Sequence, residues 1–591
     1  MLYHDILDIK FSCMLSKLRD FESMGTQSST KIAFLRNITI EPLLPFIRYQ
    51  CMTNGIKTDA YICDFDNIMQ DILDANSGLY AHNPKIIFIF IKLDHIASKL
   101  YLQFPKLNSS EISVQIENVL KYYKDMLDAL RSRTNALIIL NTFEVNPFPS
   151  GGISDSQKLE GETNIIRTLN RKLLKLTNKY IGISIIDFDL ICSRIGFVNF
   201  QNNMQWHMSK MPFSNLALKH IATEAAKFII ASEGNIKKCI IVDCDNTLWG
   251  GVVGEDGDNG ILLDQTHPGS YFLQFQKDLL NLKSHGILLA ICSKNNEADV
   301  LSVFINNENM ILKDKDFSCM KINWDLKVNN IKQISKELNI GLQHIIFVDD
   351  SDFEVEMVRE LIPEVSCILV PKNLSQLKYI FDGKGYFDKL QVSNEDSNRT
   401  EMYLAENLRS KELASFTSIN DYYKNLKIVA KARKLNDSDI TRVAQLTQKT
   451  NQFNLTTIRY SEQEIKMLMQ SNESQVITLK AEDKFGAYGL IGVAILRFKD
   501  NYCEIDTLLM SCRAIGRGLE EILFNECIKQ IKVKVVDVVY GRFSKTKKNI
   551  QVKNFFEDHG FSIKKRDTTQ KLYYCDINNI NISLPAHIKK I

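Results

Sequence analysis

The sequence lacks a hydrophobic run long enough to cross a membrane. Its most apolar stretch, residues 86–91, is far shorter than the roughly 20 residues that a membrane-spanning helix needs. The first residues show no basic segment followed by an apolar one, so we expect no secretory signal. We therefore expect a protein that has no membrane among its partners.

The chain also has almost no excess of charge of either sign. Its 73 basic and 70 acidic residues are spread along the sequence and leave a net charge of +3. Proteins that bind nucleic acids gather positive charge on one face, whereas the basic run at residues 545–548 is short and is typical of a solvated surface. We expect no nucleic acid among the partners.

Paired cysteines are absent as well. The thirteen cysteines are an odd number, and none of them forms a C-x-x-C pair or a Cys/His cluster of the kind that binds zinc. Because free cysteines persist in a reducing compartment, we expect a cytoplasmic protein in which most cysteines are small buried hydrophobic residues.

The chain is long enough for several domains. Its 591 residues exceed what one hydrophobic core can organise, and short apolar runs alternate with longer helical stretches from residue 31 to about residue 230. The same alternation begins again at Cys239, and strands separated by helices predict a parallel α/β sheet in each case. The predicted strands are residues 32–35, 86–91, 136–140 and 183–186, then residues 239–242, 287–291, 345–348 and 367–370.

A third unit follows a polar segment in which residues 401–412 are predicted to be helical. The unit has a helix at residues 439–450, strands at residues 490–496 and 504–510, and a helix after Gly518, an order that predicts an α+β fold. We find no internal repeats. The predicted boundaries are 1–234, 235–385, 386–425 for the linker and 426–591.

Two aspartates lie two residues apart where the first strand of the second predicted sheet ends. Residues 240–247 read IIVDCDNT, and the period of two places Asp243 and Asp245 on one side of the strand. Ligands of open parallel sheets bind at the carboxyl ends of the strands, which is where these carboxylates lie. A pair of this kind can also have the structural role of capping a helix. The residues at the later strand ends decide between a ligand site and a helix cap.

Three later strand ends carry matching groups, namely Ser293, Lys327 and the two aspartates at residues 349–350. Together with the first pair they indicate phosphoryl transfer. Asp243 can attack phosphorus and form an aspartyl-phosphate, while Asp245 can protonate the leaving oxygen and later activate water. Ser293 and Lys327 can hold the phosphoryl oxygens as a hydroxyl donor and a positive charge.

The same groups predict a metal ion. An anionic carboxylate reaches an anionic phosphate only if a cation reduces their repulsion, and oxygen ligands suit Mg²⁺. The candidate ligands are Asp243, Asp245, Asp349 and Asp350. The sequence therefore predicts Mg²⁺ as the cofactor and leaves open which of Asp349 and Asp350 binds it directly.

These motifs resemble the haloacid dehalogenase superfamily, and in particular its FkbH-like branch. The family usually has Asn-Pro where this chain has Ser351-Asp352, which leaves the metal ligands intact but can alter the rim of the site. About 45 residues separate Thr247 from Ser293, too few for a large inserted cap domain. The matching segments are residues 242–257 (VDCDNTLWGGVVGEDG), 291–296, 324–330 and 347–354.

The resemblance implies a substrate and a partner. FkbH-like proteins are associated with loading a glyceryl unit from 1,3-bisphosphoglycerate, a small phosphorylated acyl donor, onto the phosphopantetheine arm of an acyl carrier protein for polyketide-type biosynthesis. Cys244 is the acyl acceptor that the resemblance implies, although strand alternation points it away from Asp243 and core packing stays open as its role. The phosphate-binding residues that the resemblance implies are Thr247, Ser293, Lys294, Asn295 and Lys327.

The third unit carries an R-x-x-G-x-G loop at residues 513–518, between a predicted strand and a helix. Backbone N–H groups in such a loop can bind a pyrophosphate, and the loop resembles the coenzyme A loop of GNAT-type acetyltransferases. A G-x-G loop can also be only a tight turn, and Ala487 stands where we expect an acidic residue. We expect a retained fold that handles phosphopantetheine. The loop residues concerned are Arg513, Gly516, Arg517 and Gly518.

The first unit resembles the SGNH-hydrolase-like domain of the FkbH-like family, but residues 36–39 (RNIT) supply no Gly-Asp-Ser nucleophile. Without a serine, His207 and His220 have nothing to activate, so we expect a scaffold or docking surface. The expected architecture is thus a capless haloacid-dehalogenase Rossmann-like domain flanked by an SGNH-like α/β domain and a GNAT-like α+β domain.

Two other functions stay open at this stage. The chain can be a plain small-molecule phosphatase whose flanking domains only choose the substrate, and release of phosphate without any carrier protein would favour that function. It can also be a docking platform for a multienzyme assembly, which would need the Asp243 site to be inert. Intact motifs at four strand ends argue against the platform.

Overall fold

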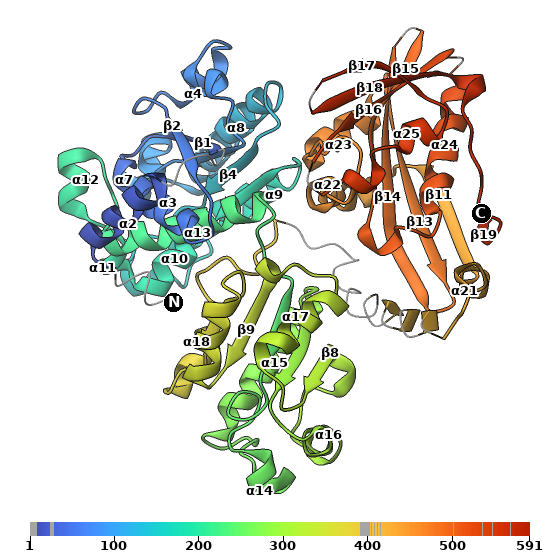
Figure 1. The fold of residues 1–591 in the computed structure, drawn as a ribbon. Helices are drawn as coiled ribbons and strands as arrows, with labels where there is room; N and C mark the ends of the chain where they lie inside the picture. The colour runs from blue at the N-terminus through green and yellow to red at the C-terminus, as the bar shows by residue number, and fades with distance from the viewer. Residues whose placement is uncertain are drawn as a thin grey trace. The chain divides into compact units, whose positions relative to one another are not determined.

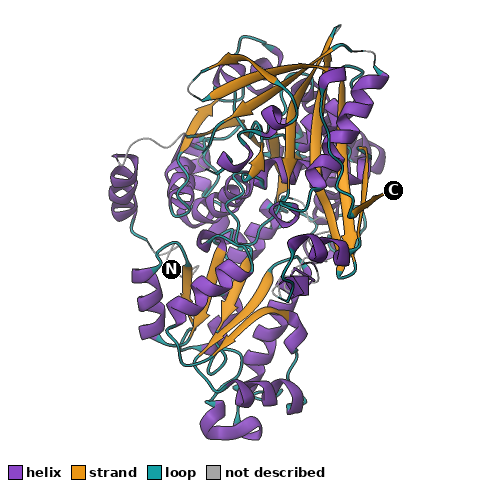
Figure 2. Cartoon of the chain, turned by 45° about the vertical axis from the view of Figure 1, so that its right-hand side comes forward, coloured by secondary structure: helices purple, strands orange, loops and turns teal. Residues whose placement is uncertain are grey.

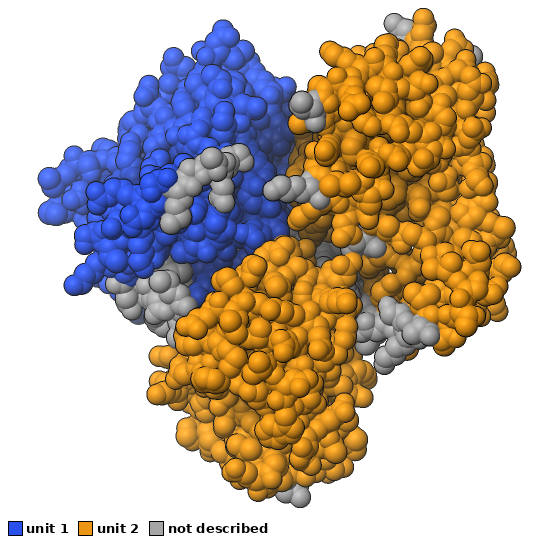
Figure 3. All heavy atoms as spheres, viewed as in Figure 1, with its two compact units in different colours: residues 1–236, 381–390 blue, residues 237–380, 391–591 orange. Residues whose placement is uncertain are grey.

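The computed structural model describes two compact units, which are treated separately below (Figure 3). One comprises Met1–Ile236 with Phe381–Leu390, and the other comprises Lys237–Ile380 with Gln391–Ile591. No helix in the described part is long and apolar enough to cross a membrane. Half of the residues of the predicted linker helix lie outside the described residues, which are 9–23, 29–390, 402, 405–406, 408–409, 412–413, 415–499, 501–534, 536–546, 548–567 and 569–591.

The first unit is built on a five-stranded parallel sheet with the order β2-β1-β3-β4-β5 (Figure 1). Alternate residues of β1 and β3 face opposite sides of the sheet. Phe34 and Phe88 pack with α3 and α13 on one side, and Leu35 and Ile89 pack with α8 and α9 on the other. Because both faces are covered, the strands are continuous apolar runs. The elements are β1 Thr30–Arg36, α3 Leu44–Met52, β2 Thr58–Ile62, β3 Ile86–Phe90, α8 Ser109–Arg131, β4 Leu137–Asn141, α9 Glu162–Thr177, β5 Ile183–Ile186 and α13 Asn215–Ser232.

The carboxyl end of β1 carries an amide in place of a hydroxyl nucleophile. The side chain of Asn37 there accepts a hydrogen bond from the backbone N–H of Lys92 at 2.8 Å and donates one to its carbonyl at 3.2 Å. His207 is exposed on α12 (Asn203–Ser209), and His220 is buried in α13, where burial lowers its pKa to about 4. That this unit is a scaffold or a docking surface stays a prediction.

The second unit begins with another five-stranded parallel sheet, in the order β10-β9-β6-β7-β8. Its order puts β6 in the centre, between β9 and β7. The backbone of residues 243–287 is described throughout, and its α-helices are α14 and α15. These residues form no separate cap domain. The elements are β6 Cys239–Val242, α14 Val253–Gly260, α15 Gly269–Ser284, β7 Leu288–Ser293, α16 Glu297–Asn306, β8 Phe317–Ile322, α17 Lys327–Glu337, β9 Ile345–Asp349, α18 Asp352–Leu361 and β10 Ser366–Leu369.

The remainder of the second unit is a mixed sheet with the order β17-β18-β16-β15-β14-β13-β11-β19. Figure 2 draws the strands of the chain in orange and its helices in purple. β15 pairs in parallel with β16 only over residues 502–505. Further along β15, residues 509–510 pair with β12 instead. The elements are β11 Ile428–Lys434, α22 Ile440–Lys449, β12 Phe453–Asn454, β13 Ser474–Asp483, β14 Gly486–Lys499, β15 Tyr502–Met510, α24 Leu519–Val533, β16 Val538–Ser544, β17 Ser562–Arg566, β18 Gln570–Asp576 and β19 Ile588–Lys590.

The predicted fold class is confirmed by these three sheets. Two parallel α/β sheets precede an α+β sheet, in the order that the sequence predicts. The predicted strands at residues 239–242, 345–348 and 367–370 agree with β6, β9 and β10 to within one residue at either end. Long apolar runs flanked by helices are the signal that made these strands predictable.

The buried amide of Asn141 provides a test of the first sheet. Its side chain accepts a hydrogen bond from the N–H of Ile91 at 2.9 Å and donates one to the carbonyl of Ile91 at 3.0 Å. Asn141→Leu would leave both buried backbone groups unpaired, so we expect a loss of about 3 kcal/mol in the free energy of unfolding. Urea unfolding of the variant measures the loss, with exposed Asn199→Leu as the control. Equal midpoints for the two variants would contradict the assignment.

Candidate phosphoryl-transfer site

The site lies where three neighbouring strands end. β6 stops one residue before Asp243, β7 ends at Ser293 and β9 ends at Asp349. Because the sheet order is β9-β6-β7 and all three strands are parallel, their carboxyl ends meet at one edge. The backbone N–H of Asp243 donates to the carbonyl of Val348 at 3.0 Å, which fixes the first aspartate beside the third strand.

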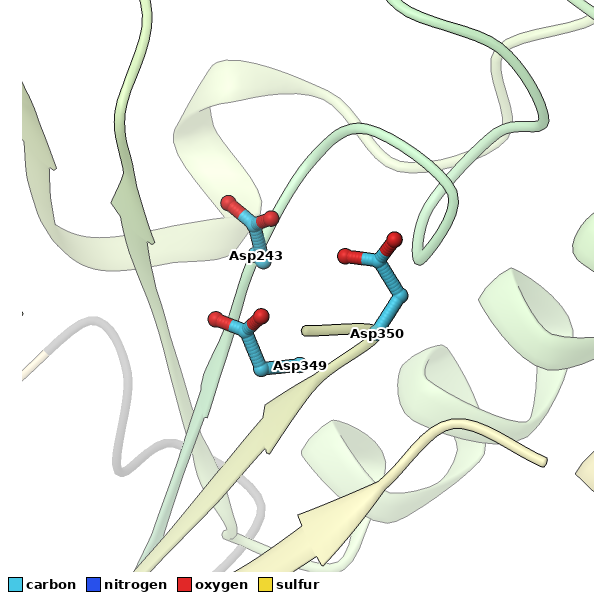
Figure 4. Close-up of side chains that lie close together, drawn as sticks. All are labelled: Asp243, Asp349 and Asp350. Atoms are coloured by element: carbon cyan, nitrogen blue, oxygen red, sulfur yellow. The ribbon is translucent and has the colours of Figure 1, made fainter. Parts of the chain in front are cut away.

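Three carboxylates converge at this edge (Figure 4). Asp243, Asp349 and Asp350 each offer an oxygen atom, and these oxygens all lie within 4.8 Å of one another. Asp243 and Asp349 are buried, whereas Asp350 is exposed. Carboxylates held this close repel one another unless a cation is shared between them, and three oxygen donors suit a hard divalent cation such as Mg²⁺.

Lys327 is the one cation among the described residues that contacts this cluster in an ion pair. Its Nζ lies 3.2 Å from Oδ2 of Asp243 and 2.5 Å from Oδ2 of Asp349. Burial, followed by the charge of Asp243, raises the pKa of Asp349 to about 7, and Lys327 opposes this increase only in part. Burial alone would lower the pKa of Lys327, but the two carboxylates outweigh it and raise that pKa. One ammonium therefore does not balance the carboxylates around it.

Two buried oxygens at the site have no hydrogen-bond partner. They are Oδ1 of Asp243 and Oγ1 of Thr247, which lies in the turn after β6. Buried polar atoms are nearly always paired in native structures, so an orphaned pair marks a place where a ligand or ion completes the bonding. The orphaned carboxylate oxygen fits an attacking group or a metal ligand, and the hydroxyl fits a phosphate oxygen.

Asp245 is held apart from the carboxylate cluster by three hydrogen bonds. Its Oδ1 accepts from the indole Nε1 of Trp249 at 2.9 Å and from the backbone N–H of Val253 at 3.1 Å. Its Oδ2 accepts from Nδ2 of Asn295 at 3.0 Å. These bonds fix a carboxylate next to the nucleophile, as an acid or base requires, while its role as a metal ligand stays a prediction.

The predicted phosphate-binding residues are not all brought together. Ser293 is buried at the end of β7, and its Oγ accepts a hydrogen bond from Nδ2 of Asn295 at 3.1 Å. Lys327 reaches the carboxylates, as described above. Lys294 instead forms an ion pair with Glu354, with Nζ 2.6 Å from Oε1. Glu354 therefore holds one of the hydrogen-bond donors of Lys294, and phosphate binding by Lys294 stays a prediction.

The structure buries Cys244, and its role as an acyl acceptor stays a prediction. Its side chain has no exposed surface. Burial, and then the charge of Asp243, raise the pKa of this thiol well above its usual value, although hydrogen bonding with Ser293 opposes the shift. The thiolate is the nucleophilic form, so this environment favours core packing, the alternative that strand alternation left open.

The loop at residues 513–518 lies between β15 and α24, and the chain itself occupies both of its arginines. Arg517 forms an ion pair with Glu406 at 2.7 Å, and Nη1 of Arg513 lies 2.8 Å from Sδ of Met402. Gly516 and Gly518 have φ of 83° and 80°, a region that favours glycine. A pantetheine arm that binds these arginines would compete with Glu406 and Met402 for them. Its binding at this loop stays a prediction.

Sequence reasoning did not identify two groups that hold the site. Trp249 follows Asp245 by four residues inside the segment that carries the resemblance, and that spacing is the signal that could have identified it. Glu354 lies in the first turn of α18, is buried, and holds Lys294, but one buried glutamate after a strand end has no specific sequence pattern. Side-chain partners across different loops depend on tertiary packing.

Replacement of Asp349 separates metal binding from folding. Asp349→Asn removes one buried negative charge, and the ion pair between Lys327 and Asp243 remains. We therefore expect the free energy of unfolding of the metal-free variant at pH 8 to equal or exceed that of the wild type. Mg²⁺ should raise the melting temperature of the wild type and not that of the variant, because ligand binding stabilises only a folded state that binds it. Thermal unfolding with and without Mg²⁺ measures both effects.

The pH dependence of metal-free stability has a definite sign. Since folding raises the pKa of Asp349 from 3.8 to about 7, its contribution makes the metal-free wild type less stable as the pH rises through this interval. The exposed Asp352→Asn serves as the control and should behave as the wild type. A full Mg²⁺ response in Asp349→Asn would remove Asp349 from the metal site.

Alkylation tests the burial of Cys244. Among the cysteines whose side chains the structure describes, only Cys13 is exposed. We expect iodoacetamide to modify Cys13 in the native protein and to reach Cys244 only after unfolding, because the reagent needs an accessible thiolate. Peptide mapping by mass spectrometry reports both sites in one experiment. Modification of native Cys244 as fast as Cys13 would contradict its burial and support its role as an acyl acceptor.

Comparisons with known proteins agree with the fold. Residues 31–230 match the family model described as the FkbH N-terminal domain. The N-terminal part of the protein BF1531 from Bacteroides fragilis, which contains a phosphatase domain and was solved in complex with Mg, is 26% identical with a TM-score of 0.58. The match covers 65% of this chain and 100% of that chain. No curated protein matches the chain.

Smaller matches cover 25% of the chain, with a TM-score of 0.21 each. One is the ribosomal-protein-S18-alanine N-acetyltransferase from Escherichia coli, 12% identical over 94% of that protein. Another is a putative acetyltransferase of the GNAT family from Desulfovibrio desulfuricans, 14% identical over 99% of that protein. The match to the FkbH N-terminal domain, and the likeness of 65% of the chain to a protein that contains a phosphatase domain, support the resemblance to FkbH-like proteins.

Proposed function

We propose that this protein is a Mg²⁺-dependent phosphoryl-transfer enzyme with Asp243 as its nucleophile. The observation that carries the proposal is the buried, unpartnered Oδ1 of Asp243 beside Lys327 and two further aspartates. An oxygen without a hydrogen bond keeps its lone pairs available for attack. The other oxygen of the same carboxylate is held by Lys327, so the side chain is oriented before substrate binds.

The reaction divides into two steps at one phosphorus atom. Oδ1 of Asp243 forms a bond to phosphorus while the bond to the leaving oxygen breaks, and Asp245 gives that oxygen a proton. Asp245 then takes a proton from water, whose oxygen attacks phosphorus and releases Asp243 and inorganic phosphate. A bound Mg²⁺, held by Asp243, Asp349 and Asp350, would reduce the repulsion between carboxylate and phosphate.

The chain's neutral donors hold the phosphoryl group during both steps. The buried hydroxyls of Thr247 and Ser293 donate to its oxygens, and the ammonium of Lys327 stabilises the negative charge that these oxygens carry. Lys327 also keeps Asp243 and Asp349 from repelling each other. The resulting preorganised charge does not have to rearrange when substrate arrives.

The substrate that we propose is a small phosphorylated acyl donor, 1,3-bisphosphoglycerate. A thiol on the phosphopantetheine arm of an acyl carrier protein would take the glyceryl unit from the acyl phosphate and release that phosphate, and Asp243 would hydrolyse the remaining phosphate ester. The FkbH-like character of the chain supports this substrate and its place in polyketide-type biosynthesis. Direct transfer to the carrier needs no enzyme thiol, which agrees with the buried Cys244.

A plain small-molecule phosphatase is the second candidate. The likeness to the Bacteroides fragilis protein that contains a phosphatase domain supports it, and a hydrolase needs no acyl acceptor on the enzyme or on a carrier. The two candidates share every step at Asp243 and differ only in whether a carrier receives the glyceryl unit. Neither candidate involves nucleic acid or a membrane.

Phosphate release tests the shared chemistry. With Mg²⁺ and a phosphate ester, the wild type should release inorganic phosphate, and Asp243→Asn should lower kcat by roughly 10³-fold or more because it removes the nucleophile. The control Asp352→Asn changes an exposed aspartate near the site and should keep the wild-type rate. An Asp243→Asn variant that is as active as Asp352→Asn would exclude Asp243 as the nucleophile.

Mass spectrometry of the carrier distinguishes the two candidates. After incubation with 1,3-bisphosphoglycerate and Mg²⁺, glyceryl transfer predicts an adduct on the carrier's phosphopantetheine arm. Free phosphate without an adduct on either protein would leave the phosphatase and exclude glyceryl transfer from this donor.

A further inference from the structure

Asn295 joins two residues of the proposed reaction that come from different strand ends. It lies in the short segment between β7 and α16 and is buried. Its Nδ2 lies 3.0 Å from Oδ2 of Asp245 and 3.1 Å from Oγ of Ser293. An amide nitrogen carries two hydrogens, so one side chain can donate to both oxygens at once.

The bond from Asn295 limits what the Ser293 hydroxyl can do. Because Asn295 donates to Oγ, it occupies one lone pair, and the hydroxyl hydrogen must point in another direction. The same hydroxyl forms a hydrogen bond with the thiol of Cys244, and sulfur is a weak acceptor. A phosphate oxygen is a far stronger acceptor than that sulfur, so the hydrogen is available to bound substrate.

The bond from Asn295 also completes the support of Asp245. Trp249 and Val253 hold Oδ1 and follow Asp245 by four and eight residues in the same stretch of chain, so they move with it. Among the described hydrogen-bond partners of the Asp245 carboxylate, Asn295 alone comes from the neighbouring strand end. The distance between the loop after β6 and the loop after β7 is therefore set at this amide.

We propose that Asn295 is a positioning residue for the first step of the reaction. It fixes the distance between the Ser293 hydroxyl, which binds the phosphoryl group, and the Asp245 carboxylate, which protonates the leaving oxygen. A substrate bound by Ser293 therefore has its leaving oxygen next to Asp245. Proton delivery in this step then depends directly on Asn295, whereas bond formation by Asp243 depends on it only through the position of Ser293. The inference rests on the proposed function.

Leaving-group dependence tests the proposal. Asn295→Ala and Asn295→Leu both remove the donors, and leucine keeps the side-chain volume in case alanine impairs folding. Each variant is compared in single turnovers with glycerol 3-phosphate, whose alkoxide must be protonated, and 4-nitrophenyl phosphate, whose phenolate leaves without a proton. We expect the rate of leaving-group release to fall by roughly 10²-fold for the alkyl ester and far less for the aryl ester.

Asn296→Ala is the matched control. This neighbouring amide donates to Asp299 at 3.1 Å and accepts from the indole of Trp324 at 3.2 Å, so it lies in the same segment without touching Ser293 or Asp245. It should match the wild type with both substrates. Equal losses for both esters, or no loss, in the folded Asn295 variants would overturn the positioning role. An inactive wild type in the same assay would instead overturn the proposed function.

Discussion

The contact of Lys327 with Asp243 and Asp349 is the interaction on which the rest of the site depends. Buried charges are costly unless they are paired, and this ammonium is shared between two buried carboxylates. It orients Asp243, leaves Oδ1 of that residue without a partner, and still leaves the cluster with an excess of negative charge once Asp350 is included. A site with this imbalance is built for a cation, and the raised pKa of Asp349 is the physical sign of it.

Topology explains why these residues meet. β9, β6 and β7 are neighbours in the sheet although β8 and a long stretch of chain separate β7 from β9 in the sequence. The sequence predicts this meeting because apolar runs mark the strands and polar residues follow each of them, and parallel strands collect their carboxyl ends at one edge. The fold class and the roles available to Asp243, Ser293 and Lys327 could be derived in this way.

The remainder depends on loops and on packing, which period and spacing do not describe. Asp245 has the right position by strand period, yet its partners Trp249 and Asn295 come from two different loops. Lys294 adjoins Ser293 in sequence and still turns to Glu354, since a buried carboxylate attracts the nearest ammonium. The ion pair between Arg517 and Glu406 likewise joins distant segments, so the sequence identified the loop at residues 513–518 but not what occupies its arginines.

The central claim is that Asp243 forms a covalent bond to phosphorus, and chemical trapping tests it most directly. A single turnover with a phosphate ester and Mg²⁺ is stopped in acid, treated with borohydride, which reduces an aspartyl-phosphate to homoserine, and mapped by peptide mass spectrometry. The account predicts homoserine at position 243 in place of Asp243. Turnover that leaves Asp243 unmodified, or reduction at another aspartate, would contradict it.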